Sequence, residues 1–271
     1  MNPLCTVLVS SCDSYRDVEK PFVKLFRKYW PDCPFETVLV SETGSVEGFD
    51  RVVLSGTGKT WCETIDFALQ QITTPYVILL MNDYFLCSPV NTPALLVRLE
   101  DAQKFNAASL RLNPMPPGRK LYAQSDLLEM PKNVAYCVTC QVSIWEHSFL
   151  SGLVKRNKSA WEFERQGSFM VADEKRPLLV TPTKEFPFLD AVHKGYWEKF
   201  GVKCLAENGI EFDFSKRSLP PLSVWLVERL KAFVFAVVPN TLIVRIQNFF
   251  DLGAKEKTLL SHSRELNIAR S

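Results

Sequence analysis

The sequence lacks an excess of charge of either sign. It has 32 Lys and Arg against 30 Asp and Glu, a formal net charge of +2 over 271 residues. A broad basic surface that binds DNA or RNA is therefore not expected. No repeat or low-complexity run occurs, and 46% of the residues are hydrophobic. This composition predicts a folded protein with a real core and no nucleic-acid partner.

Targeting and spanning segments are also lacking. The first residues have neither the basic region nor the long apolar stretch of a signal peptide. The longest uncharged run of the carboxyl-terminal tail, 232–244, has 13 residues, fewer than the ~18–20 that cross a bilayer. The eight cysteines form no dense framework. We therefore expect a cytoplasmic protein with free, mostly buried thiols.

Three sequence patterns of other enzyme classes are incomplete. The run 56–60 (GTGKT) resembles the end of a P-loop, but Val53 occupies the position of the first required glycine. Cys137 and Cys140 have the spacing of a zinc half-site, yet no second such pair exists. The hydrolase pattern G-x-S-x-G is absent. An ATPase, a zinc protein and this type of hydrolase are all disfavoured.

Strand and helix patterns alternate over the first ~110 residues, which predicts an α/β fold with a mixed, mostly parallel sheet and helices on both faces. The run 76–81 (YVILLM) is continuously apolar, as in a strand that is covered on both faces. The expected strands are 6–11, 36–41, 51–54 and 76–81, and the expected helices are 17–30, with Pro21 in its first turn, 61–72 and 92–105.

The pattern loosens after residue 110. There we expect an extended segment over 134–144, a helix over 159–166, a strand over 178–181 and a helix over 189–200. We expect residues 1–215 to form the main domain.

Two acids follow two of the expected strands. Asp13 comes just after 6–11, and Asp83 comes just after 76–81. Open α/β sheets bind ligands at the carboxyl ends of their strands, so two carboxylates there suit a nucleotide and its metal. The structural alternative is that Asp13 caps the next helix and Asp83 holds a turn.

Two segments resemble nucleotide-sugar glycosyltransferases of the GT-A type. They are Ser11-Cys12-Asp13-Ser14-Tyr15 and the run from Trp61 to Asn82-Asp83-Tyr84-Phe85-Leu86. The likeness covers roughly residues 6–215 and is strongest to bacterial transferases of capsule and O-antigen synthesis, in which the second segment ends Asp-Asp-Tyr-Phe-Leu. It implies that Asp83 meets the donor's ribose or a divalent cation, Mn²⁺ or Mg²⁺. Asn82 replaces the first Asp, and one carboxylate makes a poorer metal site than two.

A second resemblance lies in the run 159–164 (SAWEFE). GT-A transferases often have a Trp followed closely by an acid that meets the acceptor, which implies acceptor contacts for Trp161 and Glu162. Ser159 and Glu162 also form a capping-box pattern. That pattern explains Glu162 structurally and makes Glu164 the expected general base of an inverting enzyme. The alternative for Glu164 is a solvated helix acid.

The resemblance also gives roles to four residues elsewhere in the chain. His193 is expected as a metal ligand and Lys194 as a partner of the donor diphosphate, with Lys59 meeting phosphate. Asp190 is the reserve candidate for the base. A structural, partly buried histidine is the alternative for His193.

The carboxyl-terminal tail differs in charge and pattern. Residues 214–271 hold nine Lys and Arg against four acids, and two apolar stripes run through 219–250. Amphipathic helices of this kind lie on membrane surfaces. We therefore expect 216–271 to form helices that meet the inner face of the cell membrane, or that pack on the main domain or on a second copy in a homodimer.

Together these features predict transfer of a sugar from a nucleoside-diphosphate sugar to an acceptor hydroxyl. The resemblance implies a lipid-linked glycan as acceptor, in surface-polysaccharide synthesis. The alternative is a non-catalytic nucleotide-sugar-binding or scaffold subunit of a polysaccharide assembly complex. A nucleotidyltransferase is disfavoured because residues 10–16 lack the glycine-rich segment of that class.

Overall fold

The computed structural model describes residues 4–132 and 134–221. Met1–Leu219 forms one compact unit. In the described ranges, no helix combines the length and the apolar character that crossing a membrane requires. Residues 216–221 of the expected tail form a turn and irregular chain, with no helix. The rest of the expected tail, 222–271, lies outside the described residues, so the division into 1–215 and 216–271 and the role of the tail stay predictions.

A nine-stranded sheet runs through this unit in the order β3-β2-β1-β4-β9-β6-β10-β8-β7. Strands β3, β2, β1 and β4 are parallel, while β9 runs antiparallel between β4 and β6. The expected mixed α/β class is confirmed, and β6 and β10 form a further parallel pair beyond β9. The strands are β1 Cys5–Ser10, β2 Glu36–Ser41, β3 Arg51–Leu54, β4 Tyr76–Met81, β6 Ser109–Arg111, β7 Lys120–Leu121, β8 Leu128–Glu129, β9 Ser143–Glu146 and β10 Leu178–Val180.

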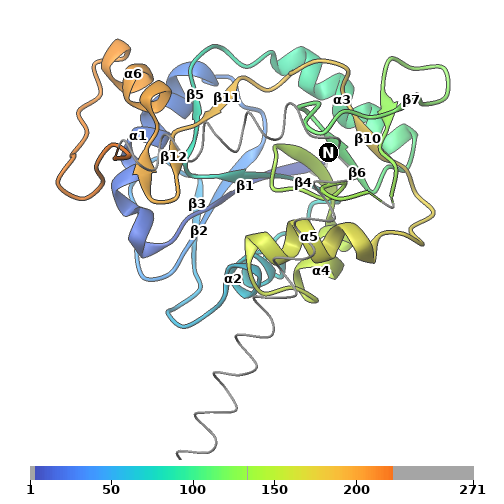
Figure 1. Cartoon of the computed structure of the whole chain (residues 1–271), viewed down its shortest axis with the longest axis horizontal. Helices are drawn as coiled ribbons and strands as arrows, with labels where there is room; N and C mark the ends of the chain where they lie inside the picture. Colours follow the sequence, from blue (N-terminus) through green and yellow to red (C-terminus); the bar gives the residue numbers. More distant parts are fainter. Residues whose placement is uncertain (1–3, 133, 222–271) are drawn as a thin grey trace, which may run out of the picture. The chain divides into compact units, whose positions relative to one another are not determined.

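Helices cover both faces of the sheet, as expected. The helices are α1 Arg16–Tyr29, α2 Trp61–Leu69, α3 Thr92–Lys104, α4 His147–Val154, α5 Ala160–Met170 and α6 Lys199–Glu207. Successive strand residues point to opposite faces, so Val7 and Val9 pack with α1, α3 and α6, whereas Leu8 packs with α2, α4 and α5. Figure 1 shows α2, α4 and α5 together on one side of the sheet.

Strand β4 contributes to both apolar layers. Ile78 and Leu80 belong to the layer beneath α1, and Val77 and Leu79 belong to the layer beneath α2. All four are almost fully buried. The continuous apolar run was therefore a correct signal for a strand covered on both faces.

The expected helix over 189–200 is wrong. This segment forms β11 (Phe188–Asp190), which pairs with β5 (Tyr84–Leu86), and a hairpin of β12 (Val192–His193) and β13 (Tyr196–Trp197). Lys194 and Gly195 connect the hairpin with φ values of +51° and +82°. Two left-handed residues make the tight turn that suits strand twist and stop a helix.

Two other local expectations need correction. Residues 134–142 form turns, and the strand begins only at Ser143. A short 3-10 helix, η1 (Asp13–Tyr15), leads directly into α1, which begins at Arg16. Pro21 therefore lies inside α1, beyond its first turn.

Two of the eight cysteines are bonded. Cys87 after β5 and Cys204 on α6 form a disulfide across 117 residues of sequence. Cys5, Cys12, Cys33, Cys62, Cys137 and Cys140 are free, and four of these six are buried. The expectation of free thiols is wrong for the pair because spacing does not reveal which distant segments meet.

Helix α6 packs closely on the segment that follows β11. A Cβ at Gly201 would lie 2.8 Å from the Ala191 Cα, whereas a Cβ at Gly152 in α4 would meet nothing within 4 Å. We expect Gly201→Ala to lower the free energy of unfolding by about 1–3 kcal/mol through overpacking. The control Gly152→Ala should raise it by about 0.5–1 kcal/mol through helix propensity. Denaturant unfolding measures both, and equal effects would contradict the close packing at Ala191.

Candidate active site

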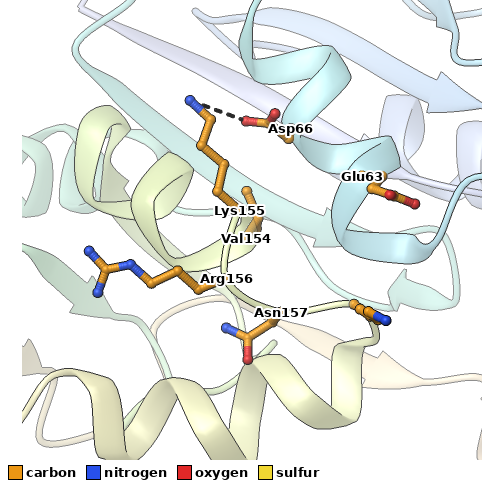
Figure 2. Close-up of a pocket in the computed structure, with 7 residues that line it drawn as sticks. Glu63, Asp66, Val154, Lys155, Arg156 and Asn157 are labelled. Carbon is orange, nitrogen blue, oxygen red and sulfur yellow. Dashed lines mark ion pairs between the residues drawn. The ribbon is translucent and has the colours of Figure 1, made fainter.

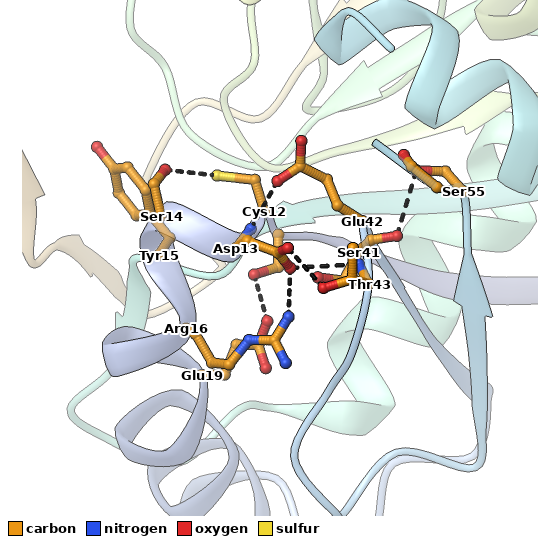
Figure 3. Close-up of polar contacts among 12 residues, drawn as sticks. Cys12, Asp13, Ser14, Tyr15, Arg16, Glu19, Ser41, Glu42, Thr43 and Ser55 are labelled. Carbon is orange, nitrogen blue, oxygen red and sulfur yellow. Dashed lines mark hydrogen bonds and ion pairs between the residues drawn. The ribbon is translucent and has the colours of Figure 1, made fainter. Parts of the chain in front are cut away.

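Polar residues gather where the parallel strands end. Ser11 and Asp13 follow β1, Glu42 follows β2 and Asn82 follows β4. Parallel strands place their carboxyl ends at one edge of a sheet, the usual ligand-binding edge of α/β folds. Figure 3 shows this edge around β1 and β2, with the loops of both strands joined by polar contacts.

Asp13 lies at this edge, but protein groups occupy its carboxylate. The Thr43 hydroxyl donates to Oδ2 at 2.6 Å, the Thr43 backbone N–H donates to Oδ1 at 3.2 Å, and Arg16 forms an ion pair with Oδ1 (Figure 3). These donors, the Thr43 hydroxyl first, lower the pKa of Asp13. Asp13 therefore ties the start of η1 to the loop after β2, and its expected contact with the donor stays a prediction.

Asn82 is a buried hydrogen-bond donor. The residue is 4% exposed. Its Nδ2 donates to Ser11 Oγ at 2.8 Å and to the Tyr15 carbonyl at 3.1 Å. Ser11 in turn donates to the buried Glu19 carboxylate at 2.6 Å. Two acceptors face the amide nitrogen, so an ionised Asp at this position would leave both without a donor. The departure from the family pattern thus has a structural reason.

Asp83 and Asp190 are brought together by the pairing of β5 with β11. Asp190 lies opposite Tyr84 in the ladder, and the Ala191 N–H donates to the Asp83 carbonyl at 2.8 Å. Desolvation, and then the nearby Asp190 charge, raise the pKa of Asp83 to about 7. Asp190 is exposed at the surface, and partial desolvation by its neighbours raises its pKa against the opposing effects of Lys184 and His193.

Glu164 approaches the same region from α5. Its Oε1 accepts a hydrogen bond from the Cys140 N–H at 2.8 Å, and the Tyr84 hydroxyl donates to the Cys140 carbonyl at 3.3 Å. One peptide segment therefore links Glu164 to the β5 strand that follows Asp83. Desolvation raises the pKa of Glu164, and the Asp190 charge adds to this rise.

Asp83, Glu164 and Asp190 thus form an acidic cluster from three distant segments. All three have raised pKa values, with desolvation as the largest cause. Groups perturbed in this way concentrate at functional sites. A carboxylate whose pKa is moved toward neutrality is a better proton acceptor at neutral pH. The cluster has the chemistry of a general acid–base site.

Lys184 is the cation that sequence reasoning missed. Its Nζ donates to the Phe188 carbonyl and lies 4.5 Å from the centre of the Phe188 ring, which in turn contacts Tyr84 at 4.6 Å between centroids. Desolvation lowers the pKa of Lys184, opposed by Asp190. No motif marks it, and its only sequence signal is its place just after the strand that ends at Val180.

Arg217, which the sequence pattern assigned to the basic, membrane-facing tail, is buried in the main unit instead. Its guanidinium pairs with Asp17 at 3.2 Å, donates to the carbonyls of Ser14 and Gly195, and lies 4.3 Å over the Tyr15 ring. The positive charge of Arg217 also offsets part of the rise in the pKa of Asp83. Arg217 therefore fastens the β12–β13 hairpin to the start of α1, beside the acidic cluster.

The expected basic residues have different surroundings. Lys59 donates to the Ser55 carbonyl at the end of β3 and lies 5.3 Å from the Phe67 ring centre. His193 and Lys194 lie in and after β12, where His193 acts on the pKa of Asp190. His193 is therefore linked to the acidic cluster by an electrostatic effect.

The acceptor residues predicted on α5 point in different directions. Trp161 is 64% exposed. Glu162 accepts the Lys158 N–H at 2.8 Å, while Ser159 Oγ accepts the Glu162 N–H at 3.2 Å. Ser159 caps α5 as expected. The reciprocal contact of a capping box differs from the expectation, because the Glu162 carboxylate accepts the N–H of Lys158 instead of that of Ser159. Acceptor contacts of Trp161 and Glu162 stay predictions.

The metal-binding prediction does not fit this arrangement. Among residues 4–132 and 134–221, no group of three or more His, Cys, Asp or Glu is placed to hold a metal ion. Position 82 supplies an amide that already donates to two protein oxygens. The described residues thus gather no such group around Asp83 or His193, and we derive no step through a metal.

Comparison with known proteins finds likeness in solved structures alone, since no family model and no curated protein matches the sequence. Staphylococcus aureus TarS 1-349 in complex with UDP-GlcNAc is 15% identical with a TM-score of 0.44, covering 68% of this chain and 57% of that chain. A cytidylyltransferase from Leptospira borgpetersenii is 10% identical with a TM-score of 0.43, covering 77% and 96%. A Methanothermobacter nucleotidyl transferase is 12% identical with a TM-score of 0.45, covering 67% and 87%. This chain thus spans little more than half of the TarS chain.

The raised pKa of Asp83 predicts a pH-dependent effect of Asp83→Asn. The folded protein holds the Asp83 proton more tightly than the unfolded chain, since the pKa rises from 3.8 to about 7. Wild-type stability therefore falls as the pH rises between these values, and the loss is complete above them. Asparagine has no proton to lose, so the variant should gain stability relative to wild type across this range.

Thermal unfolding at a series of pH values measures this difference. Asp13→Asn is the opposite-sign control, because Thr43 and Arg16 lower the pKa of Asp13. That variant should lose stability at neutral pH, with the loss vanishing in acid. Parallel curves for wild type and Asp83→Asn would contradict the raised pKa.

The buried amide of Asn82 predicts that Asn82→Asp is destabilising at neutral pH. The change removes both donors and adds a buried charge, at an expected cost of about 1–3 kcal/mol in the free energy of unfolding. Asn91 is the matched control, since its Oδ1 caps α3 by accepting the Ala94 N–H at 3.1 Å. Asp caps equally well, so Asn91→Asp should change stability by less than about 0.5 kcal/mol. Equal losses in both variants would contradict the donor role.

Proposed function

We propose that this protein is a glycosyltransferase that moves a sugar from a nucleoside-diphosphate sugar to an acceptor hydroxyl. The observation that carries the proposal is the acidic cluster of Asp83, Glu164 and Asp190, with its raised pKa values. It lies by the carboxyl ends of parallel strands, where α/β folds bind nucleotides. The family resemblance of the segments around Asp83 and Glu164 supports the same reaction class.

Glu164 is the proposed general base of an inverting reaction. The acceptor O–H gives its proton to the Glu164 carboxylate while the acceptor oxygen bonds to the anomeric carbon. The bond from that carbon to the diphosphate breaks, and the nucleoside diphosphate leaves with the electron pair. The Cys140 N–H holds one Glu164 oxygen at 2.8 Å, which orients the carboxylate. In a retaining reaction Glu164 would orient the acceptor instead, and Asp190 remains the reserve base.

The donor is proposed to bind between the acidic cluster and nearby cations. Asp83 would accept hydrogen bonds from the ribose, with Asp13 toward the nucleobase end. Lys184, beside Asp190, is the proposed partner of the diphosphate, together with Lys194 and Lys59. An ammonium group neutralises phosphate as a point charge. The residues present supply this charge without a metal site.

The acceptor is proposed to be a lipid-linked glycan of surface-polysaccharide synthesis at the inner face of the cell membrane. This part follows from the family resemblance and from the basic, amphipathic pattern of 216–271. Trp161 and Glu162 would meet the glycan near Glu164. The competing proposal, a non-catalytic nucleotide-sugar-binding subunit, is supported by the absence of an acid at position 82 and differs in having no turnover.

The decisive experiment combines binding with turnover. Purified protein is screened by thermal shift against a panel of nucleotide sugars, with EDTA and with Mn²⁺, and release of nucleoside diphosphate is then measured for each ligand that binds. A donor at 100 times its Kd stabilises a fold by ~2.7 kcal/mol. We expect a donor that binds in EDTA and is slowly hydrolysed. Binding without hydrolysis would favour the non-catalytic subunit, and no binding would reject both proposals.

Variants then test the roles. Glu164→Gln should lower kcat by ~10²- to 10⁴-fold with little change in donor affinity, because it removes the base and keeps the shape. Glu207→Gln on the surface of α6 is the control and should match wild type. Lys184→Met should weaken donor binding, and Lys184→Arg should restore part of it. A Glu164→Gln enzyme with wild-type kcat would reject the proposed base.

A further inference from the structure

Helix α5 has two faces with different surroundings. Phe163 and Ser168 are fully buried, and Glu164 reaches Cys140 at the acidic cluster. Trp161 and Phe169 are 64% and 70% exposed. They are eight residues apart, so helical geometry places them on one outward side together with the exposed Arg165. We call Trp161, Arg165 and Phe169 the outer face of α5.

A basic loop precedes this face. Lys155, Arg156 and Lys158 are exposed and line a recess of about 270 Å³ together with Glu63 and Asp66 (Figure 2). Lys155 approaches Asp66 only loosely, at 3.8 Å. From residue 155 to residue 169 the chain has four basic residues against two acids. Both acids accept hydrogen bonds from backbone N–H groups: Glu162 from Lys158 and Glu164 from Cys140. Among the exposed charged residues of the recess and the outer face, Glu63 is acidic and Lys155, Arg156, Lys158 and Arg165 are basic, so the outward charge of this region is positive.

We propose that the outer face of α5 and the basic loop dock on an anionic lipid surface. Exposed aromatic rings beside Lys and Arg are typical of helices that lie in the membrane interface. Two rings offer far less apolar area than the about 800 Å² per partner that a stable protein interface buries. Such rings still insert singly among lipid headgroups, and nearby cations add attraction to anionic lipid. The charge and the small apolar area thus match a lipid surface better than a protein partner.

Docking in this way would place the membrane beside the proposed base. Glu164 lies on the same short helix as Trp161 and Phe169, so a lipid-linked acceptor held at the surface would need to extend only across α5. This step deepens the proposed function and rests on it for the identity of the acceptor. The docking itself requires no chemistry, so the two ideas can fail separately.

Co-sedimentation of the full chain with vesicles tests the docking. The vesicles are phosphatidylcholine alone or phosphatidylcholine mixed with phosphatidylglycerol, without any nucleotide sugar. The test variant is Trp161→Ala/Phe169→Ala, and the matched control is Phe200→Ala, whose side chain is 74% exposed on α6 between Lys199 and Lys203. Figure 1 shows α6 away from α5. Circular dichroism checks that each variant is folded.

We expect wild type and Phe200→Ala to bind the phosphatidylglycerol vesicles alike, and the α5 double variant to bind at least about tenfold more weakly. Lys155→Gln/Arg156→Gln should weaken binding to these vesicles and leave the weak binding to pure phosphatidylcholine unchanged. No wild-type binding, equal binding by the α5 double variant, or an equal loss in Phe200→Ala would overturn the proposal. Equal binding by the double variant would instead assign the membrane contact to the tail.

Discussion

The antiparallel pairing of β5 with β11 is the constraint on which the candidate site depends. It brings Asp190 beside Asp83 and Tyr84 across more than a hundred residues of sequence. Helix α6 supports this pair from one side, through the close approach of Gly201 to Ala191 and the disulfide between Cys204 and Cys87. On the other side, Arg217 holds the following hairpin against α1. The grouping of these carboxylates, and with it their raised pKa values, thus depends on tertiary packing.

Charge in this region is arranged so that the carboxylates of Asp83 and Glu164 and the exposed carboxylate of Asp190 can coexist. Each carries a raised pKa, which limits the fraction that is ionised at once. A fourth acid at position 82 would add a charge at a site that is 4% exposed and linked through Ser11 to the buried Glu19, whose pKa is itself raised by burial. The neutral amide of Asn82 supplies hydrogen bonds there without adding repulsion. The avoidance of a further buried charge thus accounts for an amide at position 82.

The local parts of the fold could be predicted from the sequence. The apolar run of β4 and the Ser159 cap of α5 act through neighbouring residues, and both predictions were correct. The segment 189–200 was misjudged because its apolar spacing fits a helix as well as short strands, and the turn at Lys194 and Gly195 decides between them. Long-range features had no local pattern. Arg217 and the Cys87–Cys204 pair acquire their roles only when distant segments meet.

The distribution of charge also bears on how a nucleotide-sugar donor would lie, given the proposed function. A diphosphate placed against Asp83, Glu164 and Asp190 would meet three carboxyl groups in a partly desolvated region, where like charges repel strongly. Lys184 lies at the Asp190 end of this cluster. The phosphates are therefore best accommodated toward Lys184, with neutral ribose hydroxyls toward Asp83. The anomeric carbon, which is bonded to the diphosphate, would then lie between Lys184 and Glu164, so that the departing negative charge moves toward the cation while the acceptor proton moves to the base.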